Sequence, residues 1–394
     1  MSSAQTALLG RTTVVPAAGV ESLALYRVAF WVLLAGNLIA GWGVQWDIQW
    51  HVQVGRDSFW IPPHVMTYGG VAIVVLVSFG VLARDTLRHL LAGRAPRGTM
   101  RVAGLTGTPG FCLAACGIAL TVLAAPIDDL WHRLFGIDVT LWSPPHLLGL
   151  LGVAINTLAC LLIVREAYPA RGWVRYLGLV IAASTFFGSL GVALRPTGRL
   201  AFLYGGISFY SYPILAALFL PMALVAAARL TGHRSAPLVV MAIAIAVGVV
   251  GSWIARVGFD IIQPVSFIQE EIAKDPTSPI AVAHAIAQKN GTTPGGAPGG
   301  SLSRLLAFVP MLVMVVLDAR RRTVAATLGY AVSVFAVWTL GLGLTPAFRP
   351  MLPGAGPTAI ALLLTLSTAL LGAFAAAWLA ERLERAESSP VAAS

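Results

Sequence analysis

Ten long apolar segments separated by short loops are the feature that most constrains the fold of this chain. They lie near residues 25–46, 64–83, 103–126, 146–165, 174–194, 207–228, 237–257, 302–318, 325–345 and 357–380. A helix needs about 20 apolar residues to cross a bilayer, and the chain is 57% hydrophobic but only 11% charged. We therefore predict an all-α, polytopic integral membrane protein with about ten transmembrane helices, surrounded by the lipid bilayer.

Arginine residues gather in every second loop. They follow the second segment (Arg84, Arg88, Arg94, Arg97, Arg101), the fourth (Arg165, Arg171, Arg175), the sixth (Arg229, Arg234) and the eighth (Arg320, Arg321, Arg322). Cytoplasmic loops collect Lys and Arg, so we predict a multi-pass protein of the cytoplasmic membrane with both termini in the cytoplasm. Anionic lipid headgroups beside these loops explain the net charge of +10, and no nucleic-acid-binding motif is present.

Two stretches in the first four segments carry the same pattern of polar residues. The first reads Asp47-x-x-Trp50-His51-x-x-x-Gly55-x-Asp57 and then Trp60-x-Pro62-Pro63-His64. The second reads Asp128-x-x-Trp131-His132-x-x-x-Gly136-x-Asp138 and then Trp142-x-Pro144-Pro145-His146. We interpret them as an internal repeat. The first four helices are then two like-oriented hairpins, each with one motif at its extracytoplasmic turn.

The spacing within each motif places three potential metal ligands together, one Asp and two His. Asp47 and His51 are four residues apart and share one face of a helix, while Pro62 and Pro63 can begin the next helix with His64 in its first turn. We call this group site one. Site two comprises the corresponding residues Asp128, His132 and His146. The neighbouring Asp129 is an alternative ligand, but only Asp128 keeps the four-residue step to the histidine.

One carboxylate and two imidazoles narrow the choice of metal without fixing it. Imidazole suits copper, zinc, iron and nickel, and two His with one carboxylate is also the facial triad of non-haem iron. Thiolate ligands are not expected, because Cys112, Cys116 and Cys160 fall within apolar segments, where cysteine packs as a small core residue.

Asp57 and Asp138 lie in the loops between the ligands and are the candidate catalytic residues. They could accept hydrogen bonds from the imidazole N–H groups or act as general bases. Arg56 precedes Asp57, whereas Ile137 precedes Asp138. The two sites are therefore chemically unequal, which suggests divided roles.

A second interpretation treats the motifs as ordinary membrane-interface residues. The tryptophans around them match an aromatic belt at headgroup level: Trp42, Trp46, Trp50, Trp60, Trp131 and Trp142. A single Asp or His there would be a solvated loop residue. Two matching copies favour metal binding, because ionisable residues at membrane depth mark function.

The whole chain divides into four parts by composition. Residues 1–170 form the predicted metal-binding helical core, and 171–257 form transmembrane helices without an assigned role. Residues 258–300 are predicted to be an extracytoplasmic loop that ends in a Gly/Pro-rich linker. Residues 301–394 supply the last transmembrane helices and a short cytoplasmic tail.

The ligand spacing resembles that of a known family. Asp47-x3-His51-x12-His64 is similar to the copper motif in the membrane-embedded C subunit of particulate methane monooxygenase and ammonia monooxygenase, the copper membrane monooxygenases. That family has a second ligand set with x3 and x13 spacing, which Asp128-x3-His132-x13-His146 resembles. The family usually has Asn where this chain has Asp128. The resemblance covers about residues 25–165 and does not reach the last six helices.

The resemblance implies a copper-dependent monooxygenase, or a subunit of one, that hydroxylates a small lipophilic substrate or ammonia with O2. It also implies partner subunits, since the family's enzymes are assemblies. Two alternatives come from other classes: a copper-handling or transport protein, and a membrane hydrolase with Asp/His-bound zinc. Scattered methionines weaken the transport alternative, because only Met311 and Met314 are closely spaced.

Overall fold

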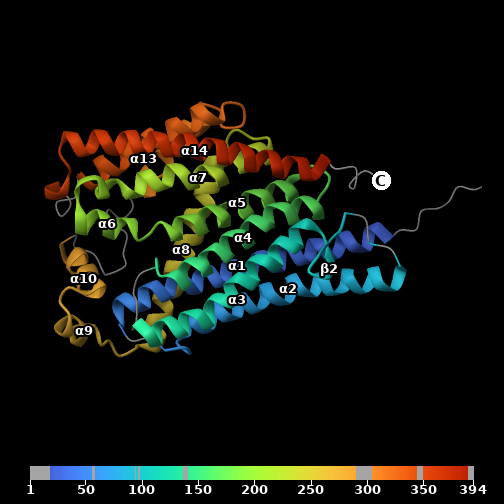
Figure 1. Ribbon diagram of the computed structural model, residues 1–394, viewed down its shortest axis with the longest axis horizontal. Coiled ribbons are helices and arrows are strands. Elements are labelled where there is room, and N and C mark those ends of the chain that lie inside the picture. The colour runs from blue at the N-terminus through green and yellow to red at the C-terminus, as the bar shows by residue number, and fades with distance from the viewer. Residues whose placement is uncertain are drawn as a thin grey trace, which may run out of the picture.

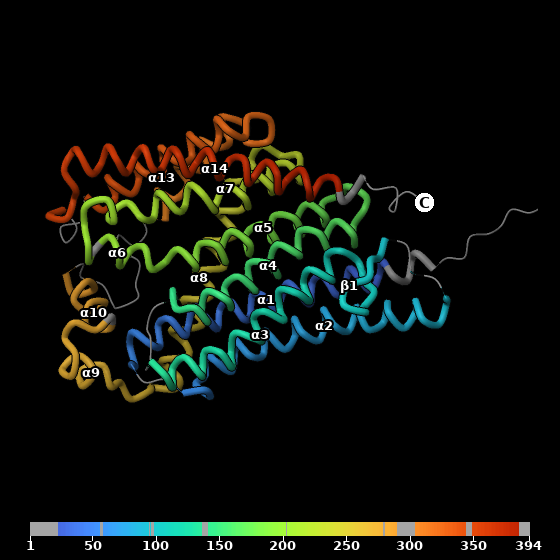
Figure 2. Tube along the Cα trace, in the orientation of Figure 1, coloured from blue at the N-terminus to red at the C-terminus, as the bar shows by residue number. Residues whose placement is uncertain are grey.

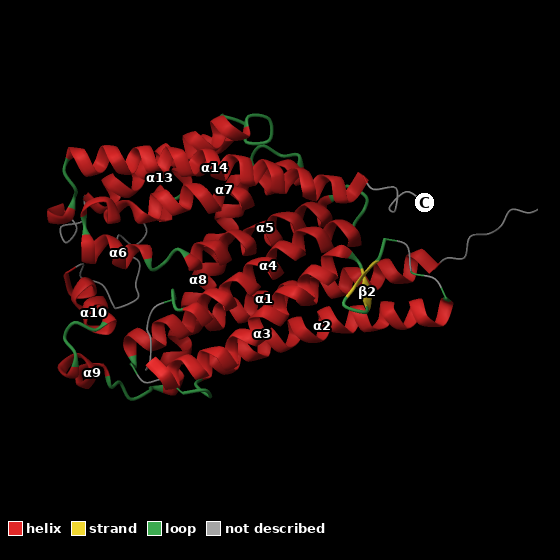
Figure 3. Ribbon diagram, in the orientation of Figure 1, coloured by secondary structure: helices red, strands yellow, loops and turns green. Residues whose placement is uncertain are grey.

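A computed structural model describes residues 18–55, 58–93, 95, 98–135, 141–289, 304–343 and 349–388. Nearly all of these residues are helical (Figure 3). The only strands among them are β1 (Met100–Val102) and β2 (Leu105–Gly107), a short antiparallel pair. The chain is thus an all-α protein, as predicted.

The long helices are α1 (Ala18–Gln53), α2 (Pro62–Ala92), α3 (Pro109–Phe135), α4 (Pro144–Ala167), α5 (Trp173–Ala193), α7 (Ser211–Thr231), α8 (Ala236–Ile262), α13 (Thr323–Gly343) and α14 (Ala355–Ser388). The shorter ones are α6 (Thr197–Tyr204), η1 (Gly206–Tyr210), α9 (Ile268–Lys274), α10 (Pro279–Lys289), α12 (Phe308–Val316) and η2 (Arg349–Met351).

Nine helices in the described part of the chain are long and apolar enough to cross a membrane. A shorter apolar helix, Arg304–Val316, lies where the tenth span was expected. Helices suit this environment because each backbone N–H and C=O is satisfied within the segment. The protein is a multi-pass membrane protein, and the expected number of helices agrees with the structure.

The helices form a bundle in which chain neighbours pack as antiparallel hairpins. Helix α1 packs on α2 and α3 on α4, while α7 packs on α14, which is distant in the chain. Figure 1 shows that α1 and α3 finish at one end of the bundle, which we call the site end. Figure 2 shows the start of α1 and the end of α14 at the opposite end.

Glycine contacts hold the first two hairpins together. A Cβ on Gly70 of α2 would lie 2.4 Å from the backbone nitrogen of Ala40 and 2.6 Å from the carbonyl oxygen of Gly36 in α1. In the second hairpin, a Cβ on Gly152 would lie 2.6 Å from the carbonyl oxygen of Gly117. Small residues let membrane helices approach this closely. Both glycine pairs have the sequence offset that relates the ligands of the two sites, which supports the internal repeat.

Asparagine side chains connect the two hairpins within the bundle. Asn37 of α1 donates a hydrogen bond to Oδ1 of Asn156 in α4 at 2.8 Å. Asn156 in turn donates to the carbonyl oxygen of Ala114 in α3 at 3.0 Å. Such interhelical hydrogen bonds are favourable where water is absent, and they fix the hairpins relative to each other.

Several short elements were not expected from hydropathy. The β1–β2 pair lies between α2 and α3, and α6 and η1 lie between α5 and α7. The predicted loop at 258–300 contains the end of α8 and then α9 and α10, while its Gly/Pro-rich run lies outside the described residues. These elements are too short or too polar to give a hydropathy signal.

Candidate metal centres

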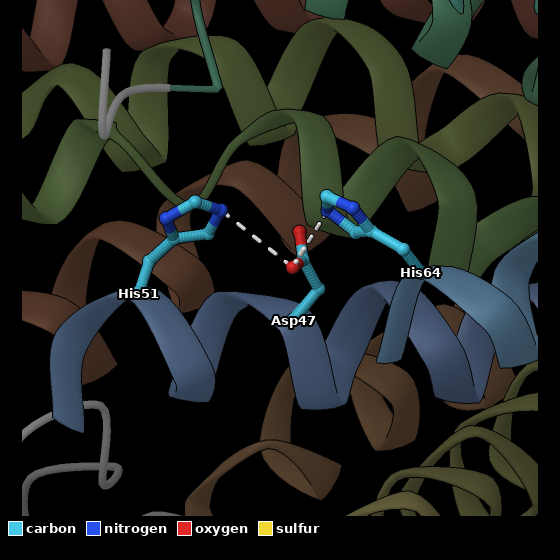
Figure 4. A group of neighbouring side chains, drawn as sticks. All are labelled: Asp47, His51 and His64. Atoms are coloured by element: carbon cyan, nitrogen blue, oxygen red, sulfur yellow. Dashed lines mark ion pairs between the residues drawn. The ribbon is translucent and has the colours of Figure 1, made fainter. Parts of the chain in front are cut away.

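Site one lies where α1 ends and α2 begins. Asp47 and His51 occupy the last two turns of α1, and His64 is the third residue of α2. Oδ1 of Asp47 lies 3.1 Å from Nε2 of His64 and 3.6 Å from Nε2 of His51. In Figure 4 both imidazole rings point toward the carboxylate between them.

Site two repeats this arrangement where α3 ends and α4 begins. Oδ1 of Asp128 lies 3.3 Å from Nε2 of His132 and 3.3 Å from Nε2 of His146. The angle between imidazole planes is 67° here and 52° in site one. The structure therefore brings together all six residues predicted as ligands, three at each site.

The separations between carboxylate and imidazole atoms are close to those needed by a single ion. Oxygen and nitrogen ligands lie about 2.0 to 2.2 Å from a metal such as zinc, so two of them around one ion are about 3 to 3.5 Å apart. At both sites the three ligand atoms all lie within 4.8 Å of one another. Either group could hold a metal ion after small side-chain rotations.

The two carboxylates have buried oxygen atoms that a cation would satisfy. Oδ1 of Asp47 and Oδ1 of Asp128 are buried and make no hydrogen bond to any residue that the structure describes. Each faces two imidazole nitrogens. A buried anionic oxygen without a hydrogen bond is costly, and a metal ion between oxygen and nitrogens would remove that cost.

The proline pairs explain how each second histidine reaches its site. Pro62 and Pro144 begin α2 and α4, as predicted, and the preceding residues are extended. Ile61 has φ −64° and ψ 149°, and Ser143 has φ −69° and ψ 152°. The residue before proline is restricted to this region. The same local geometry therefore presents a histidine from the first turn of each helix.

The structure separates Asp128 from its neighbour Asp129. Oδ2 of Asp129 pairs with Arg133 at 2.8 Å along the same helix, and both side chains are more than half exposed. Asp129 thus has a solvated partner outside the site, whereas Asp128 faces His132 and His146.

The candidate catalytic residues Asp57 and Asp138 lie outside the described residues, as do Arg56 and Ile137. Their catalytic role, and the inequality of the two sites argued from them, stay predictions. The two sites do differ in how exposed their ligand side chains are. Ligand side chains are 17–21% exposed at site one and 19–32% exposed at site two.

Sequence reasoning missed a tyrosine beside site one. The ring of Tyr68 lies one turn after His64 on α2, with a centroid separation of 5.8 Å. Phe59 lies 5.0 Å from Tyr68 and 4.9 Å from Trp60, again between ring centroids. The four-residue step from His64 to Tyr68 is the sequence signal that could have identified it.

The aromatic-belt interpretation fails for two of the tryptophans. Trp46 and Trp50 are only 7% and 6% exposed, because α8 packs alongside α1 and its Phe259 contacts both rings. Trp60 is 73% exposed, as a belt residue would be. The buried tryptophans belong to a helix interface rather than to the lipid boundary.

Asp128→Asn is expected to weaken metal binding at site two by about 10 to 100-fold, the scale reported for residues that tune a metal site. Asparagine keeps the shape and one oxygen ligand but removes the negative charge. The measurement is a competition titration against a chelator, with Asp129→Asn as the matched control. Equal loss in both variants would contradict the assignment of Asp128 as the ligand.

Two Asp/His/His groups at the site end of a helical membrane protein fit a membrane metalloprotein. The identity of the metal does not follow from their geometry. Comparison with family models, with curated proteins and with solved structures finds no match to this chain.

Proposed function

We propose that this protein is a copper-dependent membrane oxidoreductase, or the membrane subunit of one, that hydroxylates a small lipophilic substrate or ammonia with O2. The observation that carries the proposal is the pair of three-residue groups, each with one carboxylate and two imidazoles directed at one point. The spacing of these residues, which resembles that of the copper membrane monooxygenases, supports copper among the metals that such ligands accept.

The number of ligands supports a catalytic rather than a structural site. Structural sites are closed by four protein ligands, whereas catalytic sites keep a position open. Three residues form each group within the described part of the chain. When bound, copper would supply the activation of O2 at that open position.

The residues of the chain would orient the metal and exclude water from one side. Asp47 places a negative charge between His51 and His64, which favours a cation there. Phe59 and Trp60 are 53% and 73% exposed and lie beside Tyr68, whose ring in turn lies beside His64. This apolar surface supports entry of a lipophilic substrate from the bilayer.

The arginine-rich loops support an extracytoplasmic position for both sites. Arg84 and Arg88 lie near the end of α2 that is opposite the site end. By the positive-inside rule this end faces the cytoplasm, so both termini would be cytoplasmic. Partner subunits, which the family resemblance implies, would then be found by co-purification from native membranes.

Metal analysis tests the proposal. We expect purified protein to contain copper and its oxidised form to give a Cu(II) electron paramagnetic resonance signal with splitting from imidazole nitrogen. Oxygen consumption should depend on a lipophilic substrate or ammonia and on copper. Zinc as the only bound metal, with no oxygen consumption, would contradict the proposal and favour the hydrolase alternative.

A further inference from the structure

The last carbonyl groups of α1 are bound by a segment more than 200 residues away in the chain. His284 of α10 contacts the carbonyl oxygen of Val52 through Nε2 at 2.8 Å. The Ser266 hydroxyl donates to the carbonyl oxygen of Gln53 at 2.7 Å, and the Phe267 N–H donates to that of Val54 at 2.8 Å. A helix leaves its last four carbonyls without intrahelical partners, so this segment caps the end of α1.

The tautomer of His284 follows from its partner. A carbonyl oxygen only accepts hydrogen bonds, so Nε2 of His284 must carry the proton. The bond joins α10 directly to the residue that follows His51. The segment 266–284 therefore holds the turn of α1 that carries a ligand of site one.

Helix α8, which precedes this capping segment in the chain, also packs against α1 and forms hydrogen bonds with it. Gln45 donates to the carbonyl oxygen of Gly248 at 3.0 Å and to Ser252 at 2.9 Å. Closer to the site, the Trp50 ring stacks on Phe259 with a centroid separation of 5.9 Å. These contacts lie on both sides of Asp47 along the helix, and the second directly precedes His51.

The same contacts extend to the start of α2. Trp50, Val54 and Ile61 form a buried cluster with Phe259 packed against it. Trp50 precedes His51, and Ile61 is the residue before the proline pair that leads to His64. One cluster thus fixes the backbone beside both histidines of site one.

The contacts beside site two are different: Trp142, just before α4, donates to the carbonyl oxygen of Ala193 in α5 at 2.7 Å. In the last turn of α3, Leu134 and Phe135 are 66% and 68% exposed. At the end of α1, by contrast, Val54 is 4% exposed. The two sites share a ligand geometry but differ in the structure behind it.

We propose that the segment α8–α10 is a positioning device specific to site one, with His284 as its positioning residue. It preorganises site one for its metal through contacts with α1 and the start of α2. Ligands held by a packed and hydrogen-bonded supporting layer bind metal more tightly than unsupported ones. This inference rests on the proposed function, since it requires both groups to bind metal.

The test uses full-length protein in which only one site is left. With site two removed by His132→Ala, we expect His284→Ala to raise the Kd of site one for Cu²⁺ about 10-fold, the low end of the effect of residues that orient ligands. His284→Gln keeps an N–H donor and should restore most of the affinity. With site one removed by His51→Ala, His284→Ala should leave the Kd of site two unchanged.

The outcomes separate this inference from the proposed function. No metal binding in the His132→Ala protein would overturn the proposed function. Normal binding that His284→Ala does not weaken, or an equal loss at both sites, would overturn the positioning role alone. Should His284→Ala fail to fold, Ser266→Ala removes the bond to the carbonyl oxygen of Gln53 and the acceptor of the Ile268 N–H. The same loss confined to site one is then expected.

Discussion

Replacement of His51 by alanine is expected to lower the affinity of site one for its metal by more than about 100-fold, beyond the range seen for residues that only support ligands. The remaining Asp47 and His64 cannot form a closed set around the ion. Activity with O2 should be lost with the metal. A chelator competition titration measures the affinity, and oxygen uptake measures the activity.

The matched control for this prediction is His233→Ala. His233 is exposed and lies between α7 and α8, away from both sites in the sequence and at the ends of helices that carry no ligand. The His233→Ala variant should bind metal and consume oxygen as the native protein does. Full metal content and full activity in His51→Ala would mean that site one is a solvated pair of helix ends.

Gly70→Val is expected to separate α1 from α2 and to empty site one. The added Cβ would meet backbone atoms of Ala40 and Gly36 at 2.4 and 2.6 Å, and backbone cannot rotate away as a side chain can. Overpacking typically costs about 1 to 3 kcal/mol of stability, and a clash with backbone lies at the upper end. Thermal unfolding and metal content measure the two effects.

Gly69→Val provides a control one residue away. Nothing lies within 4 Å of a Cβ at this position, and the residue is exposed. We expect unchanged stability and full metal content. Equal behaviour of the two variants would show that the close approach of α1 and α2 does not determine the geometry of site one.

Much of the fold could be predicted from the sequence because its signals are local. In a membrane, the backbone N–H and C=O groups of each long apolar segment form hydrogen bonds within that segment's own helix. Hydropathy alone therefore predicts the number of helices and that they span the membrane. The starts of α2 and α4 followed from Pro62 and Pro144, since proline is favoured in the first turn. The convergence of Asp47, His51 and His64 could be predicted because Asp47 and His51 are four residues apart on one helix, and the loop after α1 brings His64 back to the same end.

The structure behind site one could not be predicted, because its signals are distant in the chain. Phe259 and His284 reach α1 from over 200 residues away, and nothing in their local sequence marks them. Trp46 and Trp50 were therefore interpreted as belt residues, although they face α8. Contacts between distant segments become visible only once the helices are packed in three dimensions. The helix α9 is also too short and polar to show a helical pattern of apolar residues in the sequence.

The most direct test of the central claim is the number of metal ions bound by a matched series of single-site variants. The native protein should bind about two ions per chain, His64→Ala and His146→Ala about one each, and the double variant none, since each group supplies three ligands of one ion. X-ray absorption should show nitrogen and oxygen neighbours at about 2.0 to 2.2 Å. The same metal content in all four proteins would contradict the account.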